Sequence, residues 1–159
     1  MQDRFKVRVW NTLVKKFSYF DKPEMQIGTG GFDSGLIFPL SDNSNLYMGK
    51  YSELQFCTGL KDKNGKLIYE GDILDLYVSS KKLYRYEVKY EIGSFMLVSQ
   101  DEIFDFPNVW NDNVYPLSQL YYEYQNEENC IDECEIIGNV YENPELLEKE
   151  LNNANISNE

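Results

Sequence analysis

Alternation of hydrophobic and polar residues is the strongest regular pattern along this chain. It runs over 5–10 and again over 84–90, where Tyr84, Tyr86, Val88 and Tyr90 fall on one face. A period of two residues predicts β-strands with one buried face. Shorter apolar runs predict further strands at 17–20, 36–38, 54–58, 66–69, 73–78, 95–98 and 135–141. The pattern therefore predicts a mainly β protein.

Turn residues separate these strands. Asp, Asn and Gly at 62–65 and Glu-Gly at 70–71 suit tight turns, as does the segment 91–94. Short strands at this spacing predict a small SH3-like or otherwise bent β-barrel core at about 55–100, with the N-terminal strands packed beside it. Over 135–151 we expect a strand and then a short helix, with Asn143 as its cap and Pro144 in its first turn. The chain 1–159 is predicted to form one domain with a polar tail at 152–159.

Composition narrows the chemistry. The 159 residues include 15 Lys and Arg, 27 Asp and Glu and no His, for a net charge of −12. Residues 1–99 hold 14 basic and 12 acidic side chains, whereas 100–159 hold one basic and 15 acidic side chains. Without His there is no imidazole general base, no Ser-His or Cys-His nucleophile pair and no His metal ligand. The acidic half repels phosphate and anionic membranes, and it favours basic partners or serves solubility alone.

Cysteine usage and hydropathy predict a soluble, cytoplasmic protein. An odd number of cysteines, Cys57, Cys130 and Cys134, does not indicate a disulfide framework. The N-terminal segment lacks the apolar stretch of a signal peptide, and no run approaches the roughly 18 apolar residues of a membrane span.

Four motifs suggest chemistry, and each has a simpler structural explanation. Gly-Thr-Gly-Gly at 28–31 lacks the Lys-Ser/Thr of a phosphate loop, so we expect a flexible loop at 28–35. The residues at 62–65 lack the ligands and helices of a calcium loop and suit a hairpin turn. Cys130 and Cys134 lack enough companion ligands for zinc, and their acidic surroundings disfavour the thiolate. The carboxylates of Glu70 and Asp72 could hold a metal or shape a turn around Gly71.

Three blocks of sequence together resemble a known family. Phe-Lys-Val-Arg-Val-Trp at 5–10, Thr-Gly-Leu-Lys-Asp-Lys-Asn-Gly-Lys-Leu-Ile-Tyr-Glu-Gly-Asp-Ile at 58–73 and Ile-Ile-Gly-Asn-Val-Tyr-Glu-Asn-Pro-Glu-Leu-Leu at 136–147 are similar to the YopX family of bacteriophage and prophage proteins. The blocks follow one another in the same order as in the family. Residues 20–50 and 99–130 differ from the family in length and composition. The resemblance implies a mostly β fold and a phage or prophage origin, and with that origin the cytoplasm of a bacterial host cell as the location. It implies no activity. We expect structural roles for its motif residues: Thr58, Gly59, Asp62, Gly65, Tyr69, Glu70, Gly71, Asp72, Gly138, Asn143 and Pro144.

The first functional hypothesis is a non-enzymatic accessory protein, without cofactor or metal, that binds a host or phage protein. Phe104, Phe106 and Trp110 lie in an acidic loop at 101–114, where they either anchor a partner or cover an open barrel end. A specific version is an acidic mimic of nucleic acid that occupies a basic cleft, with binding that salt weakens. The candidate acidic contacts are Glu127, Glu128, Asp132 and Glu133.

Two other hypotheses use different residues. The aromatic face at 84–90 could stack single-stranded bases beside a basic cluster, or it could belong to the core. The basic residues near it are Lys81, Lys82, Arg85 and Lys89. A hydrolase using Glu70, Asp72 and a divalent metal ranks last. A homo-oligomer built through strand edges is compatible with each hypothesis.

Overall fold

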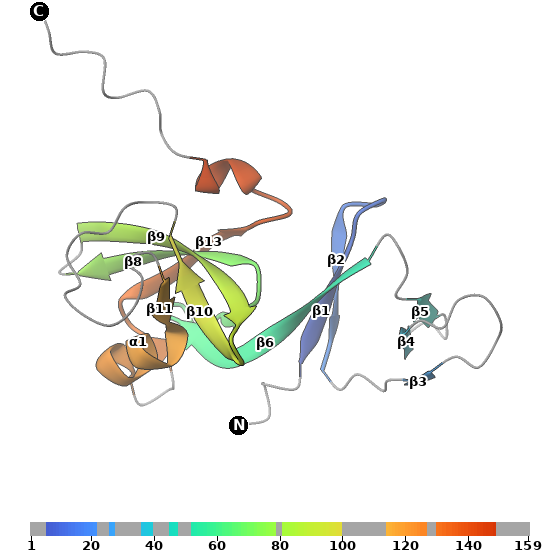
Figure 1. Cartoon of the computed structure of the whole chain (residues 1–159), viewed down its shortest axis with the longest axis horizontal. Coiled ribbons are helices and arrows are strands. Elements are labelled where there is room, and N and C mark those ends of the chain that lie inside the picture. Colours follow the sequence, from blue (N-terminus) through green and yellow to red (C-terminus); the bar gives the residue numbers. More distant parts are fainter. Residues whose placement is uncertain are drawn as a thin grey trace, which may run out of the picture.

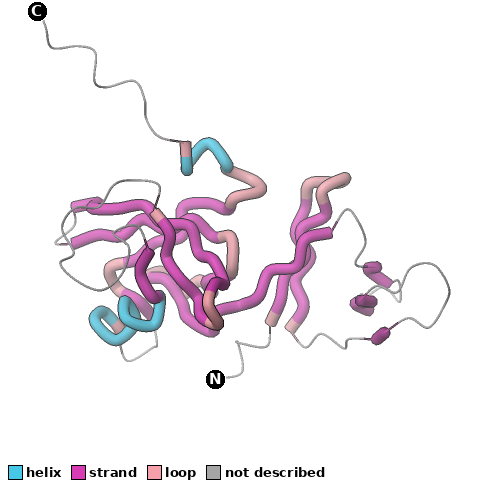
Figure 2. Tube along the Cα trace, viewed as in Figure 1, coloured by secondary structure: helices cyan, strands magenta, loops and turns pink. Residues whose placement is uncertain are grey.

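Strands dominate the computed structural model of the chain (Figures 1 and 2). It describes residues 6–21, 26–27, 36–39, 45–47, 52–78, 81–99, 114–126 and 130–148. The prediction of a mainly β fold is confirmed. No helix in these ranges is long and apolar enough to cross a membrane.

The described strands form three sheets. The first has the order β12 (Cys130–Ile131), β6 (Ser52–Asp62), β1 (Val7–Asn11) and β2 (Lys16–Phe20), with β7 (Leu67–Tyr69) also paired to β6. The second has the order β11 (Val114–Pro116), β10 (Ser94–Val98), β9 (Lys81–Glu91), β8 (Asp72–Val78) and β13 (Cys134–Asn139). A small third sheet contains β3 (Gln26–Ile27), β4 (Leu36–Pro39) and β5 (Asn45–Tyr47).

Strand β6 connects the two main parts of the molecule. Its first half is antiparallel to β1, from Ser52 to Phe56, and its second half pairs with β7 and with the parallel strand β12. Figure 1 shows β6 crossing from the curved β8–β10 sheet to the β1–β2 hairpin. Since β11 and β13 are not paired to each other among the described strands, the expected barrel takes the form of a bent, open sheet.

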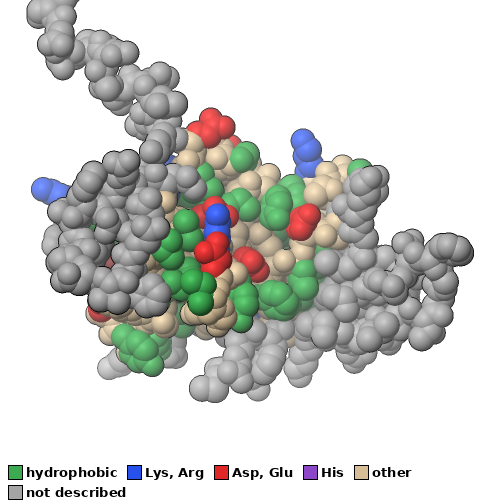
Figure 3. All heavy atoms as spheres, viewed as in Figure 1, with side chains coloured by type: hydrophobic (Ala, Val, Ile, Leu, Met, Phe, Trp, Pro, Cys, Tyr) green, Lys and Arg blue, Asp and Glu red, His purple; other side chains and the backbone are tan. Residues whose placement is uncertain are grey.

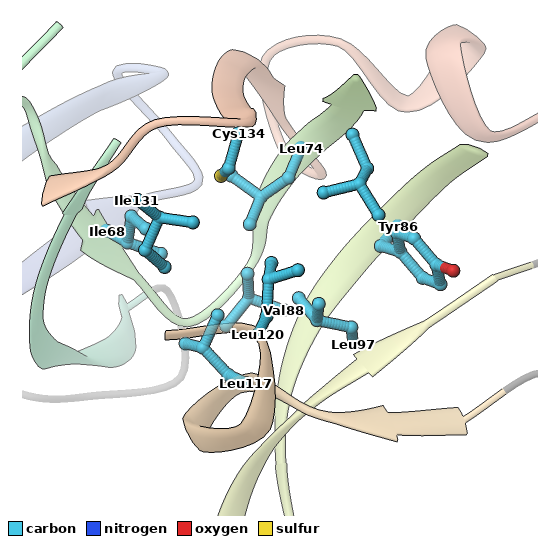
Figure 4. Packing of buried hydrophobic residues seen from close by; sticks show 10 residues of the cluster. Ile68, Leu74, Tyr86, Val88, Leu97, Leu117, Leu120, Ile131 and Cys134 are labelled. Carbon is cyan, nitrogen blue, oxygen red and sulfur yellow. The ribbon is translucent and has the colours of Figure 1, made fainter. Parts of the chain in front are cut away.

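The main core lies inside this bent sheet. Figure 4 shows side chains from β7, β8, β9, β10, β12 and β13 converging on the helix α1 (Leu117–Tyr124). The helix buries Leu117 and Leu120, and the sequence analysis did not predict it. A smaller cluster forms around Val7 and Val9, with Phe20 and Leu54 packed against them.

Two local expectations need correction. The strand β1 is buried on both faces, because Arg8 and Trp10 are as inaccessible as Val7 and Val9. The C-terminal helix is a 3₁₀ turn, Pro144–Leu147, without a side-chain cap. Asn143 instead packs against Gly138, where an added Cβ would lie 2.7 Å from its Oδ1. Residues 149–159 lie outside the described residues.

Candidate functional site

Four buried polar side chains join the two main sheets. They are Arg8 of β1, Gln55 of β6, Asp72 of β8 and Asn139 of β13, each at most 3% exposed. Arg8 donates from Nε to Gln55 Oε1 at 2.6 Å and from Nη2 to Asp72 Oδ1 at 2.6 Å. Asn139 Nδ2 donates to the same two oxygens at 3.4 Å each. We call these four residues the buried network.

The charges of the buried network are neutralised within it. The Arg8 guanidinium lies 4.5 Å from the centre of the Phe17 ring and 4.8 Å from that of Tyr69. Asp72 Oδ2 accepts a hydrogen bond from the Tyr69 backbone N–H at 2.8 Å. Burial raises the pKa of Asp72, and Arg8 opposes this rise. Because both carboxylate oxygens have partners, Asp72 is poorly placed to bind a metal together with Glu70. Glu70 contacts Arg8 only through its backbone carbonyl oxygen, which accepts a hydrogen bond from Arg8 Nη2.

Gly71 shows why the sequence needs a glycine next to this network. Its φ is +78°, and an added Cβ would lie 2.0 Å from Gln55 Nε2. Its N–H donates to the Val88 carbonyl, and its carbonyl accepts from the Val140 N–H. The turn at Glu70-Gly71 therefore ties β9 and the segment after β13 to the buried network.

Other motif residues hold the neighbouring turn. Asp62 is 1% exposed, and its Oδ1 accepts from the backbone N–H groups of Asn64 and Lys66 at 2.9 Å each. Its Oδ2 accepts from the Ile136 N–H at 3.1 Å. Thr58 donates to the Ile68 carbonyl at 2.9 Å. These contacts match the expected hairpin turn and leave the Asp62 carboxylate fully occupied.

Most of the aromatic face at 84–90 belongs to the core. Tyr86 is 3% exposed, Val88 is fully buried, and Tyr84 packs against them. Only Tyr90 of this stripe is open to solvent, at 53% exposure. A base-stacking platform needs accessible rings, so this geometry favours the core alternative.

The basic cluster near that face is partly neutralised by two neighbouring carboxylates, those of Asp75 and Glu87. Arg85 forms a bidentate pair with Asp75, at 2.7 and 2.9 Å, and also donates to the Leu146 carbonyl. Lys82 lies 3.5 Å from Asp75, and Lys89 lies 3.3 Å from Glu87. Less of the cluster's charge is thus left for phosphate.

The three cysteines are buried, and none of them forms a disulfide bond. Burial raises the pKa of Cys134 far above its usual range, which disfavours the nucleophilic thiolate. Within the described ranges, no group of three or more Cys, Asp and Glu side chains is arranged to hold a metal ion.

Two cavities open beside the buried network. We call the first, of about 320 Å³, the acidic cavity, because Glu53, Glu70, Glu87 and Glu91 line it together with one basic residue, Lys89. The second, of about 380 Å³, is the apolar cavity, which is lined by Phe56, Cys57, Thr58, Tyr90 and Phe95. Tyr90 lines both, so the cavities are neighbours. Figure 3 shows acidic and basic side chains close together between hydrophobic ones near the middle of one face.

Several predicted site residues lie elsewhere. Phe104, Phe106, Trp110, Glu127 and Glu128 are outside the described residues, as is the glycine-rich segment 28–35. Asp132 and Glu133 lie in the turn between β12 and β13, where Asp132 Oδ1 accepts from Asn126 Nδ2 at 2.6 Å and the Glu133 carbonyl accepts from the Tyr77 N–H.

Of the residues that line the two cavities, the sequence analysis selected Thr58, Glu70, Gly71, Lys89 and Tyr90 for other roles. It did not select Phe56 and Phe95 of the apolar cavity or Glu53, Glu87 and Glu91 of the acidic cavity. One signal was available: Ile precedes Gly in the turn after β9, where Asn or Asp is usual. The four glutamates come from distant segments, and only the fold brings them together.

Comparison with known proteins decides the family. The protein-family model described as YopX protein matches residues 6–148, which include every strand of the two main sheets. The chain belongs to the YopX family. Asp62, Gly71 and Asp72, whose contacts are described above, lie within the matched residues of this YopX protein.

Solved structures agree with this YopX fold. The crystal structure of protein yopX from Bacillus subtilis is similar, with a TM-score of 0.54, 21% identity and coverage of 91% of this chain and 99% of the other. Protein EF1440 from Enterococcus faecalis has a TM-score of 0.50 and 25% identity, with coverage of 90% and 97%. No curated protein matches the chain.

Proposed function

We propose that this YopX protein is a non-enzymatic accessory protein of a phage or prophage that binds a host or phage protein. The observation that supports the proposal is that the polar groups of the protein fall into two sets, one buried and one accessible. Asp62, Asp72 and the three cysteines are buried, and Asp72 accepts a hydrogen bond from Arg8, whereas Glu70 lines the acidic cavity. The accessible cavities are lined by aromatic rings, which are enriched at protein interfaces, and by glutamates, which attract basic groups of a partner.

The charge of the chain favours a basic partner, such as a protein that itself binds nucleic acid. The net charge of −12 attracts positive surfaces over the range of the Debye length, and salt weakens this attraction. The protein needs no cofactor for this role. The alternatives of nucleic-acid binding and metal hydrolysis have less support, because Tyr86 and Asp72 are buried.

Affinity capture from bacterial lysate, with and without nuclease, tests the proposal. The full chain serves as bait, and mass spectrometry identifies the proteins retained. We expect a basic protein whose recovery survives nuclease and falls as salt concentration rises. Recovery that disappears with nuclease, or the absence of any specific protein, would contradict the proposal.

A paired set of baits separates specific binding from general charge attraction. Asp132 and Glu133 can be changed to Asn and Gln to test the turn between β12 and β13, and Glu53 and Glu91 to Gln to test the acidic cavity. Each pair removes two negative charges, so a difference between them reports the position of the contact.

A further inference from the structure

The tip of the β9–β10 hairpin carries an unusual residue. Ile92 has a φ of +54° and a side chain that is 91% exposed. A β-branched residue is crowded in the left-handed region, where Gly or Asn is favoured, as at the adjacent Gly93 with φ +76°. Both the backbone conformation and the exposed apolar side chain are unfavourable in the isolated protein. Strained positions of this kind concentrate at functional sites.

The apolar cavity lies close to the tip of the same hairpin, because Tyr90 and Phe95 form the second residue pair from the turn. Tyr90 and Phe95 come from its two strands, and their ring centres are 5.2 Å apart in an edge-to-face arrangement. Phe56, which is 47% exposed, lines the cavity from β6. These three rings and Ile92 place apolar surface both inside the cavity and at the hairpin tip. We call this set, Phe56, Tyr90, Ile92 and Phe95, the hairpin surface.

The acidic cavity, which is negatively charged, lies next to the hairpin surface. It shares Tyr90 with the apolar cavity and contains four carboxylates against the single ammonium group of Lys89. Glu87 lies 3.3 Å from that ammonium group, so Glu53, Glu70 and Glu91 provide the excess negative charge. A ligand that fills both cavities therefore needs an apolar group and a positive group close together.

We propose, resting on the proposed function, that the hairpin surface docks a segment of a partner protein with an apolar side chain near a Lys or Arg. The apolar side chain enters the apolar cavity against Phe56 and Tyr90, and the cation faces Glu53 and Glu91. Charge complementarity selects this occupant. A nucleic acid would meet the same carboxylates with its phosphates, and a second copy would approach with its own net charge of −12.

Selection from a display library of random peptides against the full chain tests the chemistry of the occupant. The selected peptides should combine an aromatic or large aliphatic residue with nearby Lys or Arg. Their affinity, measured by fluorescence anisotropy on synthetic peptides, should fall as salt concentration rises. Selection of no peptides, or of peptides without basic residues, would overturn the inference.

Matched variants test the position of the site. Ile92→Asn and Phe56→Ser should each weaken binding of a selected peptide by about tenfold or more, as expected for an apolar anchor. Leu13→Asn is the control, because Leu13 is also exposed, at 67%, in the turn of the β1–β2 hairpin. Circular dichroism spectra check that each variant is folded. Equal affinities for the parent, Ile92→Asn and Leu13→Asn would overturn the inference.

The same variants used as lysate baits distinguish the two proposals. If Ile92→Asn and Phe56→Ser retain the captured protein at parent levels, the hairpin surface is wrong and the proposed function stands. If the parent captures no specific protein, the proposed function itself fails. Sedimentation of the parent and of Ile92→Asn tests whether the occupant is a second copy of the chain. A parent that sediments as a dimer and an Ile92→Asn variant that sediments as a monomer would also overturn the inference.

Discussion

The carboxylates of Asp72 and Glu70 are separated by one residue, yet they belong to two contrasting regions. Asp72 is 1% exposed and paired with Arg8, whereas Glu70 lines the acidic cavity with three other glutamates. The buried network pairs every charge that it contains, and the acidic cavity keeps an excess of one sign. Pairing inside the protein serves the fold, because an unpaired buried charge is strongly unfavourable. An unbalanced charge at the surface remains available to a partner.

The largest expected effect comes from breaking the buried pair. Arg8→Met leaves the Asp72 carboxylate buried without its cation, so the free energy of unfolding should fall by about 3–5 kcal/mol. Urea denaturation followed by circular dichroism measures this loss. Arg8→Met combined with Asp72→Leu should be more stable than Arg8→Met alone, because it contains no unpaired charge. The surface control Glu53→Gln should change stability by less than about 0.5 kcal/mol. Similar losses of unfolding free energy for Arg8→Met and Glu53→Gln would contradict the proposed difference between the buried network and the acidic cavity.

Two glycines with the same backbone conformation test the packing of the buried network. Gly71 and Gly65 have φ values of +78° and +77°, but only Gly71 has Gln55 within contact distance of an added Cβ. Gly65→Ala should lower the free energy of unfolding by about 1–2 kcal/mol, the cost of left-handed backbone. Gly71→Ala should cost more, because Gln55 must move and release Arg8. Equal losses of unfolding free energy for Gly65→Ala and Gly71→Ala in urea denaturation would show that Gln55 can move without cost to the buried network.

The pH dependence of stability probes the ring beside Arg8. Burial raises the pKa of Tyr69 to about 12, against about 10 in an unfolded chain. The folded state therefore retains the phenol proton at pH values where the unfolded state releases it. The resulting stabilisation is complete below about pH 10 and is lost as pH rises toward about 12. Urea midpoints across this range should fall less steeply in Tyr69→Phe than in the parent. Parallel curves would contradict the assignment to Tyr69.

The smallest effect is expected at the hairpin tip and has the opposite sign. Ile92→Asn places a residue that tolerates the left-handed region in an exposed turn, so it should raise the free energy of unfolding by about 0.5–1 kcal/mol. A thermal melt monitored by circular dichroism measures this gain. Loss of stability instead would indicate that Ile92 supports the fold, and would weaken the case for a binding role.

Local patterns predicted much of the fold. Alternation located β1 and β9, and turn chemistry located the bends at 62–65 and 70–71, because these features depend on neighbouring residues. The helix α1 was missed even though Leu117, Leu120, Tyr121 and Tyr124 have helical spacing. A single amphipathic segment of eight residues gives a weak signal among so many aromatic residues.

The candidate site was less predictable, because its parts meet only through tertiary structure. Arg8 and Asp72 are 64 positions apart, and nothing local shows that Arg8 is buried. The four glutamates of the acidic cavity come from β6, β9 and the turn before β8. Alternation placed Tyr86 and Tyr90 on the same face, but only the fold determines that Tyr86 is buried and Tyr90 is accessible.

The buried network has a consequence for synthesis on the ribosome. Arg8 emerges early, but Asn139, which shares both of its side-chain partners, is made 131 residues later. At about 5–20 residues per second, roughly 7–26 s pass before the set is complete. During this interval the nascent β1–β2 hairpin lacks part of its final polar environment. Aggregation during translation should therefore depend on how quickly the segment 130–148 follows, and slow codons upstream of it should lower the yield of folded protein.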